Sequence, residues 1–397
     1  MGKIDDLIKE LCPDGVSMWS LGDLEDSGKI KLGRGMVISK NDIADNPGDY
    51  PVYSSSATGL GEFGRYSKYM FDDERITWSV DGGGRFFHRK AHKYSVTNVS
   101  GWIKVNDANI ITKYLYYVLD NLWLTKKFDY VKKAHPSVIR NEYNIFIPPL
   151  EVQKEIVRVL DSFTELEAEL EAELEARKKQ YEYYRNTLLT FNERERVEWL
   201  PLEEVFVMRN GYTPSKSNKD YWINGTLPWF RMDDIRMNGR ILSDSIQHIT
   251  KEALKKGGLF PSGSIILATT ATIGEHALLT ADSLANQRFT FFTKRELLKD
   301  RLLDKFSYYY FYIIDEWCKK NTKVSSFPAV DMARLKKYNF PIPPIERQKQ
   351  IISILDKFEK LTIDISIGLP AEIEARRKQY EYYRNKLLTF KELECAG

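Results

Sequence analysis

The chain carries the stretch Ile147-Pro-Pro-Leu-Glu-Val-Gln-Lys154, and 195 residues later it repeats this stretch as Ile342-Pro-Pro-Ile-Glu-Arg-Gln-Lys349. A second motif, Gln180-Tyr-Glu-Tyr-Tyr-Arg-Asn186, returns without change at 379–385, 199 residues later. The chain therefore contains one segment twice, and an internal repeat of this kind governs the fold.

The first copy predicts one long helix. Two prolines block helix before it, and Pro149 fits the first helical position, where no N–H is needed. Leu, Ala and Glu dominate 166–176, and all three favour helix. A helix of about 42 residues would be roughly 63 Å long. With Arg177 filling one slot, apolar and aromatic residues recur at alternating steps of four and three, the spacing of a coiled-coil seam, at Leu170, Leu174, Tyr181, Tyr184, Leu188 and Phe191.

The second copy is four residues longer than the first. The extra residues fall between Phe358 and Glu374, beside Gly368 and Pro370. We expect them to kink or underwind the second helix. Two such helices in one chain can pair with each other and hold two globular domains apart.

The composition is that of an ordinary globular protein, with 43% hydrophobic and 29% charged residues among 397 and a net charge of +3. No apolar run is long enough for a transmembrane helix, and the N-terminus lacks the apolar core of a signal peptide. Cys12, Cys318 and Cys395 lie far apart without metal-ligand spacing, which favours buried or incidental thiols in a reducing cytoplasm.

The two segments before the helices share a skeleton of short β-rich runs and little else. Five anchors recur in order, from Arg34-Gly35 matching Arg209-Asn-Gly211 to Val138–Asn144 matching Met332–Asn339. The chain order is therefore domain, helix, domain, helix, with boundaries at 1–149, 150–196, 197–344 and 345–397. One fold with two loop sets implies two related tasks on different targets.

Positive charge gathers in the first domain. Between Arg85 and Arg140 there are eleven Lys or Arg and three Asp, with aromatic residues such as Trp102 and Tyr130 between them. A basic stretch in a folded domain is typical of phosphate-backbone binding, although a solvated basic face is the plainer alternative.

Catalytic motifs are missing. The sequence has no phosphate-binding loop, no Asn-Pro-Pro-Tyr motif for base methylation and no convincing nuclease motif. Gly82-Gly83-Gly84 reads as a turn at a strand end. His88 and His92 have no third ligand nearby, so a metal site is not expected.

The duplicated helices and divergent domains resemble the specificity subunit of type I restriction–modification systems. The resemblance covers nearly the whole chain and is carried by the Pro-Pro-x-Glu-x-Gln-Lys openings, the Tyr-Glu-Tyr-Tyr-Arg-Asn closings and the start Glu10–Val16. It implies a mixed α+β fold in which two target recognition domains are spaced by two long antiparallel coiled-coil helices with pseudo-two-fold symmetry.

The resemblance also implies function and partners. Each domain would bind one half of a split, asymmetric site in double-stranded DNA, and the helices would set the gap between the halves. The helices would also dock two modification subunits and the restriction subunits. The chain itself would be non-catalytic and need no cofactor, since S-adenosylmethionine, ATP and Mg would be bound by partner subunits.

Specific residues follow from charge and spacing. For DNA contact we predict Arg34, Lys40, Arg65, Arg85, His88, Arg89, Lys132, Lys133, Arg209, Lys216, Arg231, Arg236, Arg288 and Lys323. For the coiled coil and subunit docking we predict Gln153, Leu170, Leu174, Tyr181, Tyr184, Gln348, Tyr380 and Tyr383. Two other classes stay open: a coiled-coil scaffold with protein-binding domains, and a fused restriction or methylation enzyme.

Overall fold

The computed structural model describes residues 2–55, 59–81, 85–128, 131–192, 195–323, 328–362 and 367–393. It divides into two compact units. Unit 1 comprises Met1–Glu171 and Glu372–Gly397, and unit 2 comprises Ala172–Ala371. The predicted boundaries separated domains from helices, whereas each unit contains one globular domain together with parts of both helical segments.

Unit 1 is built around a four-stranded antiparallel sheet in the order β2-β8-β5-β6. The strand β5 is buried along its whole length because Ile76 and Trp78 fill the core on one face while Thr77 and Ser79 pack on the other. A second sheet has the order β4-β3-β7, and β1 pairs with β9. The elements are α1 (Gly2–Leu11), β1 (Met18–Ser20), α2 (Leu21–Asp26), β2 (Ile30–Arg34), α3 (Lys40–Asp45), β3 (Tyr50–Tyr53), β4 (Glu62–Tyr66), β5 (Arg75–Ser79), β6 (Phe86–Arg89), β7 (Ser95–Val96), β8 (Ser100–Val105), α4 (Thr112–Trp123), α5 (Pro136–Glu142) and β9 (Asn144–Phe146).

Unit 2 repeats this plan. Its main sheet has the order β11-β18-β15-β16-β13, in which the first four strands correspond to those of unit 1 and β13 is added in parallel. The elements are β10 (Glu198–Pro201), α7 (Leu202–Val205), β11 (Phe206–Asn210), η1 (Lys219–Tyr221), β12 (Leu227–Phe230), α8 (Met232–Asn238), β13 (Ile241–Leu242), β14 (His248–Ile249), η2 (Lys251–Ala253), β15 (Ile265–Ala268), β16 (His276–Leu279), β17 (Leu284–Ala285), β18 (Phe289–Lys294), η3 (Glu296–Leu298), α9 (Asp304–Lys320), β19 (Thr322–Lys323), β20 (Ala329–Val330), α10 (Met332–Lys336) and β21 (Asn339–Ile342).

A glycine after the first core strand is required in both units. A Cβ on Gly35 would lie 2.2 Å from the carbonyl oxygen of Val96. A Cβ on Gly211 would lie 2.3 Å from that of Ala285. The chain can therefore pass this close to β7 or β17 only without a side chain, which explains the anchor glycines shared by the two domain sequences.

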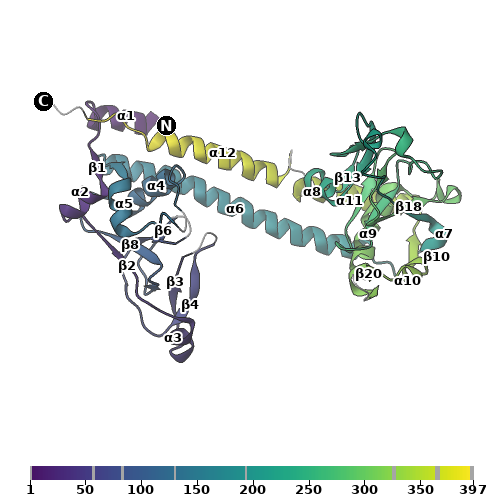
Figure 1. The fold of residues 1–397 in the computed structure, drawn as a ribbon, viewed down its shortest axis with the longest axis horizontal. Helices are drawn as coiled ribbons and strands as arrows, with labels where there is room; N and C mark the ends of the chain where they lie inside the picture. Colours follow the sequence, from purple (N-terminus) through teal and green to yellow (C-terminus); the bar gives the residue numbers. More distant parts are fainter. Residues whose placement is uncertain are drawn as a thin grey trace. The chain divides into compact units, whose positions relative to one another are not determined.

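The first helical segment forms a single helix as predicted. It is α6 (Leu150–Leu188), the long teal helix in Figure 1, and its 39 residues are close to the predicted length. Phe191 lies beyond its end. The second segment forms two helices, α11 (Ile345–Thr362) and α12 (Leu369–Leu387), instead of one. The predicted irregularity is thus a break in the helix, although residues 363–366 lie outside the described part of the chain.

Within each unit one phenylalanine packs on the aromatic side chains of the repeated closing motif. In unit 1, Phe163 on α6 stacks on Tyr383 of α12, with ring centroids 5.5 Å apart. In unit 2, Phe358 on α11 stacks on Tyr184 of α6 at 5.4 Å. In unit 1, Arg377 of α12 pairs with Glu167 and Glu171 of α6, so the two helices run antiparallel there. The coiled-coil seam predicted from the spacing is therefore an aromatic one.

The repeated glutamine attaches each spacer helix to its globular domain. The side chain of Gln153 accepts the N–H of Ile111, the residue before α4, and donates to the carbonyl oxygens of Asn109 and Pro148. Gln348 bonds Leu303, Arg301 and Pro343 in the same way at the start of α9. Both glutamines are fully buried. The prediction that they dock a partner subunit is therefore wrong for this structure, because neither side chain reaches the surface.

No helix within the described residues is both long and apolar enough to cross a membrane.

We expect Gln153→Leu to lower the free energy of unfolding of unit 1 by about 3 kcal/mol, since one buried N–H and two carbonyl groups lose their partner. The exposed Gln379 provides the control, and Gln379→Leu should change stability by less than about 0.5 kcal/mol. Hydrogen exchange of the Ile111 amide across a denaturant series reports on unit 1 alone. Unchanged protection of that amide in Gln153→Leu would contradict the anchoring role.

Candidate nucleic-acid interface

One edge of the unit 1 sheets gathers polar loop residues. Arg34 at the end of β2 pairs in register with Gly101, and Ser79 at the end of β5 pairs with Ser100. The end of β3 lies beside the end of β7, because Tyr53 pairs with Val96. The turns that follow β2, β3, β5 and β7 therefore lie together at one end of the strands. We call this surface the polar edge of unit 1; its residues are Arg34, Ser54, Ser55, Ser79, Asp81, Thr97 and Asn98.

Hydroxyl groups and main-chain carbonyls hold this edge together. Ser54 Oγ lies 2.8 Å from Thr97 Oγ1, and Ser55 Oγ contacts both Ser79 Oγ and the carbonyl oxygen of Asp81. The Arg34 guanidinium donates to the carbonyl oxygen of Asn98. The edge is thus ordered by hydroxyl groups, main-chain carbonyls and one guanidinium, all of which can exchange partners with another polar molecule. Gly82–Gly84 and 56–58 adjoin it and lie outside the described residues.

Unit 2 builds the same edge from different side chains. Asn210 at the end of β11 faces Thr290 and accepts a hydrogen bond from its hydroxyl at 2.9 Å. Thr213 Oγ1 donates to Gln287 Oε1 at 2.5 Å. The polar edge of unit 2 is completed by the turn between β17 and β18 and by the loop after β15; its residues are Asn210, Thr213, Thr269, Asn286, Gln287 and Arg288.

The segment before α5 or α10 runs along each edge and adds positive charge. In unit 1 the Lys133 ammonium lies 2.9 Å from Asp81 Oδ1. In unit 2 the N–H of Val330 donates to the carbonyl oxygen of Thr269, and Lys323 pairs with Asp331 at 3.0 Å. The Lys323 ammonium lowers the pKa of the Asp331 carboxyl. Residues 324–327, between these strands, lie outside the described chain.

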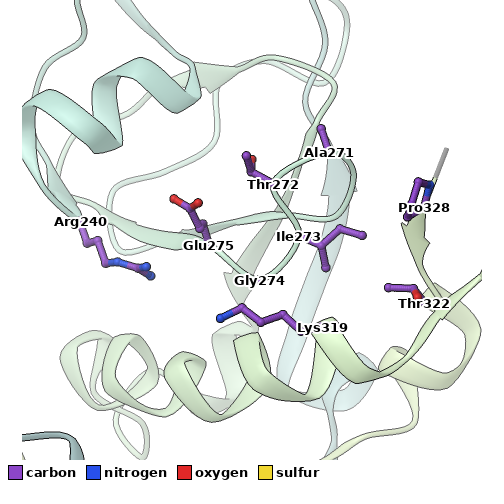
Figure 2. A pocket seen from close by; sticks show the side chains of 9 residues that line it. All are labelled: Arg240, Ala271, Thr272, Ile273, Gly274, Glu275, Lys319, Thr322 and Pro328. Carbon is purple, nitrogen blue, oxygen red and sulfur yellow. The ribbon is translucent and has the colours of Figure 1, made fainter. Parts of the chain in front are cut away.

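A hollow of about 710 Å³ adjoins the polar edge of unit 2. Figure 2 shows that the charged ends of Arg240 and Lys319 both face the space between the β15–β16 loop and α9. Within that loop Ala271 has a φ of 66°, a left-handed conformation that costs energy for a residue with a side chain. The hydroxyl of the next residue, Thr272, is buried without a hydrogen-bond partner among the described residues. Such a strained polar loop is typical of a recognition surface.

The chemistry of the two edges suits base recognition. Ser, Thr, Asn, Gln and Arg are the side chains that donate to and accept from base edges in the DNA grooves. Few of these groups are paired charges, so their side chains can reorient at little electrostatic cost. The polar edges therefore have the composition of a sequence-reading surface flanked by a small number of phosphate-binding cations.

The structure divides the DNA contacts predicted for unit 1 into four groups. Arg34 and Lys133 lie at the polar edge. Arg65 lies on β4 of the neighbouring sheet, and Lys40 begins α3, a helix that contacts β4; Arg65 bonds Glu62 and the carbonyl oxygen of Asp49. Lys132 pairs with Glu142 at 2.7 Å on the exposed surface near α5.

The remaining predictions in unit 1 fall inside the domain. Arg89 is buried, lies over the Tyr53 ring at 3.6 Å and donates to Thr77, and burial lowers its pKa to about 10. His88 bonds Glu74 at 2.6 Å and packs near the Tyr116 ring. Burial raises the pKa of Tyr116 and of the half-buried Asp120, and the positive charge of Arg85 opposes this rise. Arg89 and His88 are therefore placed in structural roles, which argues against the predicted DNA contacts.

In unit 2, Arg288 lies at the polar edge and Lys323 lies beside it. Arg231 directly follows β12, and its main-chain N–H bonds Asp234. Arg209 instead lies over the Phe260 ring at 4.3 Å and donates to the carbonyl oxygen of Gly257. Lys216 is exposed in the loop after β11, and Arg236 is exposed on α8.

Charge alone did not identify the hydroxyl and amide residues of the edges. Their position in the fold distinguishes them: Ser79 ends β5, and Asn98 and Asn286 follow β7 and β17 within two residues, where side chains from separate strands converge. Within the described ranges, no group of three or more His, Cys, Asp or Glu side chains that could hold a metal ion occurs.

Comparison with known proteins decides the family. The model of the type I restriction modification DNA specificity domain matches residues 13–176 and again residues 195–375. The chain belongs to this family. The two matches coincide with the duplication, since each covers one globular domain and the start of the helical segment that follows it.

Relatives agree over most of the chain. It is 37% identical over 366 residues to the EcoR124I/EcoR124II specificity subunit of Escherichia coli, covering 87% of this chain and 85% of the relative. It is 53% identical over 208 residues to the EcoprrI specificity subunit of Escherichia coli, a match that spans about half of each chain (51% and 52%).

Solved structures show the same fold. A structure described as showing complex assembly and conformational transition of the type I R-M system aligns with a TM-score of 0.61 at 17% identity, covering 95% of this chain and 98% of that one. The S subunit of M. genitalium aligns with a TM-score of 0.53 at 15% identity, over 94% and 96%. The predicted mixed α+β fold is therefore confirmed.

For this family member we expect the paired change Arg34→Gln and Lys133→Gln to weaken binding to duplex DNA. Removing two phosphate contacts should flatten the dependence of log affinity on log salt by about 1.8, because each contact contributes about 0.9. The control, Lys9→Gln with Lys154→Gln, removes equal charge from exposed positions on α1 and α6. Equal slopes for both pairs in a salt titration would exclude the polar edge as the phosphate-binding surface.

Proposed function

We propose that this specificity-family chain selects the DNA sites of a type I restriction–modification complex, with each unit reading one half of a split site. The observation that carries the proposal is that the polar edge is built twice on equivalent strand ends with different side chains. Ser54, Thr97 and Asn98 in unit 1 are replaced by Arg231, Asn286 and Gln287 in the corresponding turns of unit 2. Two copies of one frame that present different donors and acceptors suit the reading of two different base sequences.

Mapping of methylated sites tests this proposal. Residues 200–340 would be replaced by the matching segment of a relative, and the chain would be expressed with the modification subunit of its own system. One half of the methylated site should change and the other should stay the same, because each polar edge is formed within a single unit. A simultaneous change of both halves would contradict independent reading, and a chain that left the genome unmethylated in the wild-type complex would contradict the function itself.

The helical segments act in this proposal as a spacer of fixed length. The sequence Leu166–Glu169 is repeated at Leu170–Glu173 within α6, where both quartets continue one helix. Each quartet contributes about 6 Å of rise and roughly 40° of rotation beyond a full turn. Because B-DNA rises about 3.4 Å per base pair, one quartet corresponds to between one and two base pairs.

Deletion of Leu170–Glu173 should shorten the gap between the half-sites by one or two base pairs and leave both half-sites unchanged. The matched control replaces Leu170, Glu171 and Glu173 with alanine beside the native Ala172, which keeps the helix length and removes the seam leucine. Methylation mapping of both variants gives the gap directly. An unaltered gap in an active deletion complex would show that α6 does not measure the distance.

The repeated closing motif supplies two equivalent docking surfaces in this proposal. Tyr183 and Tyr382 occupy the same position in the two copies, and their side chains are 66% and 62% exposed. Each is held edge-on against the next tyrosine, at 5.5 Å from Tyr184 and 5.2 Å from Tyr383. Exposed, pre-ordered aromatic side chains are favoured at protein interfaces. Two identical surfaces fit two copies of one partner, and we assign this partner as the modification subunit.

Methyl transfer and DNA cleavage then belong to partner subunits, with S-adenosylmethionine, ATP and Mg bound there and the restriction subunits joining the same assembly. The absence of catalytic motifs from the sequence supports this assignment of catalysis to the partner subunits. A role as a protein-binding scaffold would predict no salt-dependent binding of DNA, so the salt titration above separates the two functions.

Tyr183→Ala should remove one of two bound modification subunits, Tyr382→Ala the other, and the double variant both. Native mass spectrometry of the assembled complex counts the subunits. Tyr69→Ala is the control, because Tyr69 is also exposed but lies in the recognition domain of unit 1. Retention of two modification subunits by the double variant would exclude this surface as the docking site.

A further inference from the structure

The arginine of the repeated closing motif is buried in both units, unlike the exposed tyrosine two residues before it. Arg384 is 8% exposed, and the side chain of Arg185 is 12% exposed. The Nε atom of each is buried and has no hydrogen-bond partner among the described residues. Because a buried guanidinium carries a large desolvation cost, its retention at the same position in both copies calls for a role.

In unit 2 this arginine contacts the recognition domain through α9. The Arg185 guanidinium lies 4.3 Å from the centroid of the Tyr312 ring. Arg240, which belongs to the recognition domain, lies 5.0 Å from the same ring and pairs with Asp315 at 3.2 Å. The Tyr312 ring therefore contacts one guanidinium group of the spacer helix and one of the recognition domain.

In unit 1 the equivalent arginine, Arg384, affects the pKa of a residue of the domain helix α4. Asp120 occupies the position of Tyr312, as shown by the neighbouring equivalent pair Tyr117 and Tyr309, which make the same bond to the spacer. Burial raises the pKa of the Asp120 carboxyl, while the charges of Arg85 and Arg384 oppose that rise. The charges of a spacer arginine and a domain arginine thus both act on the carboxyl of one residue here too.

The same domain helix is held at a second point by the other spacer helix. In unit 1, Asp161 of α6 accepts hydrogen bonds from Tyr117 at 2.5 Å and from Lys113 at 2.7 Å. In unit 2, Asp356 of α11 accepts one from Tyr309 at 2.5 Å and pairs with Lys305 at 2.9 Å. A helix fixed to one spacer helix can still tilt about it, whereas a second contact to the other spacer helix removes that freedom.

We propose that Arg185 and Arg384 are positioning residues that fix the orientation of each recognition domain on its helix pair and so make the complex strict about the gap between half-sites. The inference rests on the proposed function. Arginine is suited to this role because its planar guanidinium stacks on an aromatic ring and forks onto a carboxylate, which lysine cannot do equally well.

The test measures methylation rates of complexes reconstituted with the modification subunit. Substrates carry the natural half-sites with the natural gap or with a gap one base pair longer or shorter. Arg384→Met and Arg185→Met should each reduce the preference for the natural gap about fivefold, in the range expected when one contact between neighbouring groups is lost. The controls are Arg376→Met and Arg177→Met, which alter a second repeated arginine that is more exposed and pairs within its own helix. Their gap preference should stay within about twofold of wild type.

An unchanged gap preference in folded Arg384→Met and Arg185→Met, with only a slower rate, would overturn the proposal and leave the arginines a purely structural role. Asp120→Asn gives an independent reading if Arg384→Met does not fold, because it keeps the side-chain size and removes the carboxylate on which the Arg384 charge acts. This variant should relax the gap preference, and an unchanged preference would overturn the proposal for unit 1. A wild-type complex without any gap preference would instead contradict the proposed function.

Discussion

The burial of one glutamine at the start of each spacer helix is the constraint on which the remaining structure depends. Two prolines follow the preceding strand, and Gln153 or Gln348 donates to the carbonyl oxygen of the first of them while accepting the N–H just before α4 or α9. The spacer helix is thereby tied to the domain helix that carries the tyrosine and lysine contacts to Asp161 or Asp356. Removal of this side chain would expose buried polar groups, so its geometry is strongly specified.

Duplication gives the molecule a common frame and frees the loops to differ. The glutamine and the phenylalanine–tyrosine stack recur with matching contacts in both units. The strand ends recur as well, since Gly35 and Gly211 hold equivalent close approaches. Contacts that form the frame use backbone geometry and buried side chains, whereas residues at the polar edges are held mostly by neutral hydrogen bonds. A change at the edge therefore costs little stability, and a change in the frame costs much.

Ion pairing explains why the basic stretch of unit 1 is not one continuous DNA-binding surface. Lys132, Lys126 and Lys113 are each paired with a carboxylate, and Arg89 is enclosed by aromatic side chains. Charges close together in the sequence alternate between faces of strands and helices, so only some of them reach the edge where the loops converge. Net charge along a sequence therefore overstates the charge available to a ligand.

The sequence by itself determined the repeat, the long first helix, the presence of an irregularity in the second segment and the two related domains, because periodicity, proline and glycine act locally. It also determined the family through the repeated motifs. Tertiary structure alone decided that each unit combines a domain with parts of both helical segments, since that depends on which helices pair. It also decided that Gln153 and Arg384 are buried and that Ser79 and Asn98 meet at one edge, because burial and convergence depend on contacts between residues far apart in the chain.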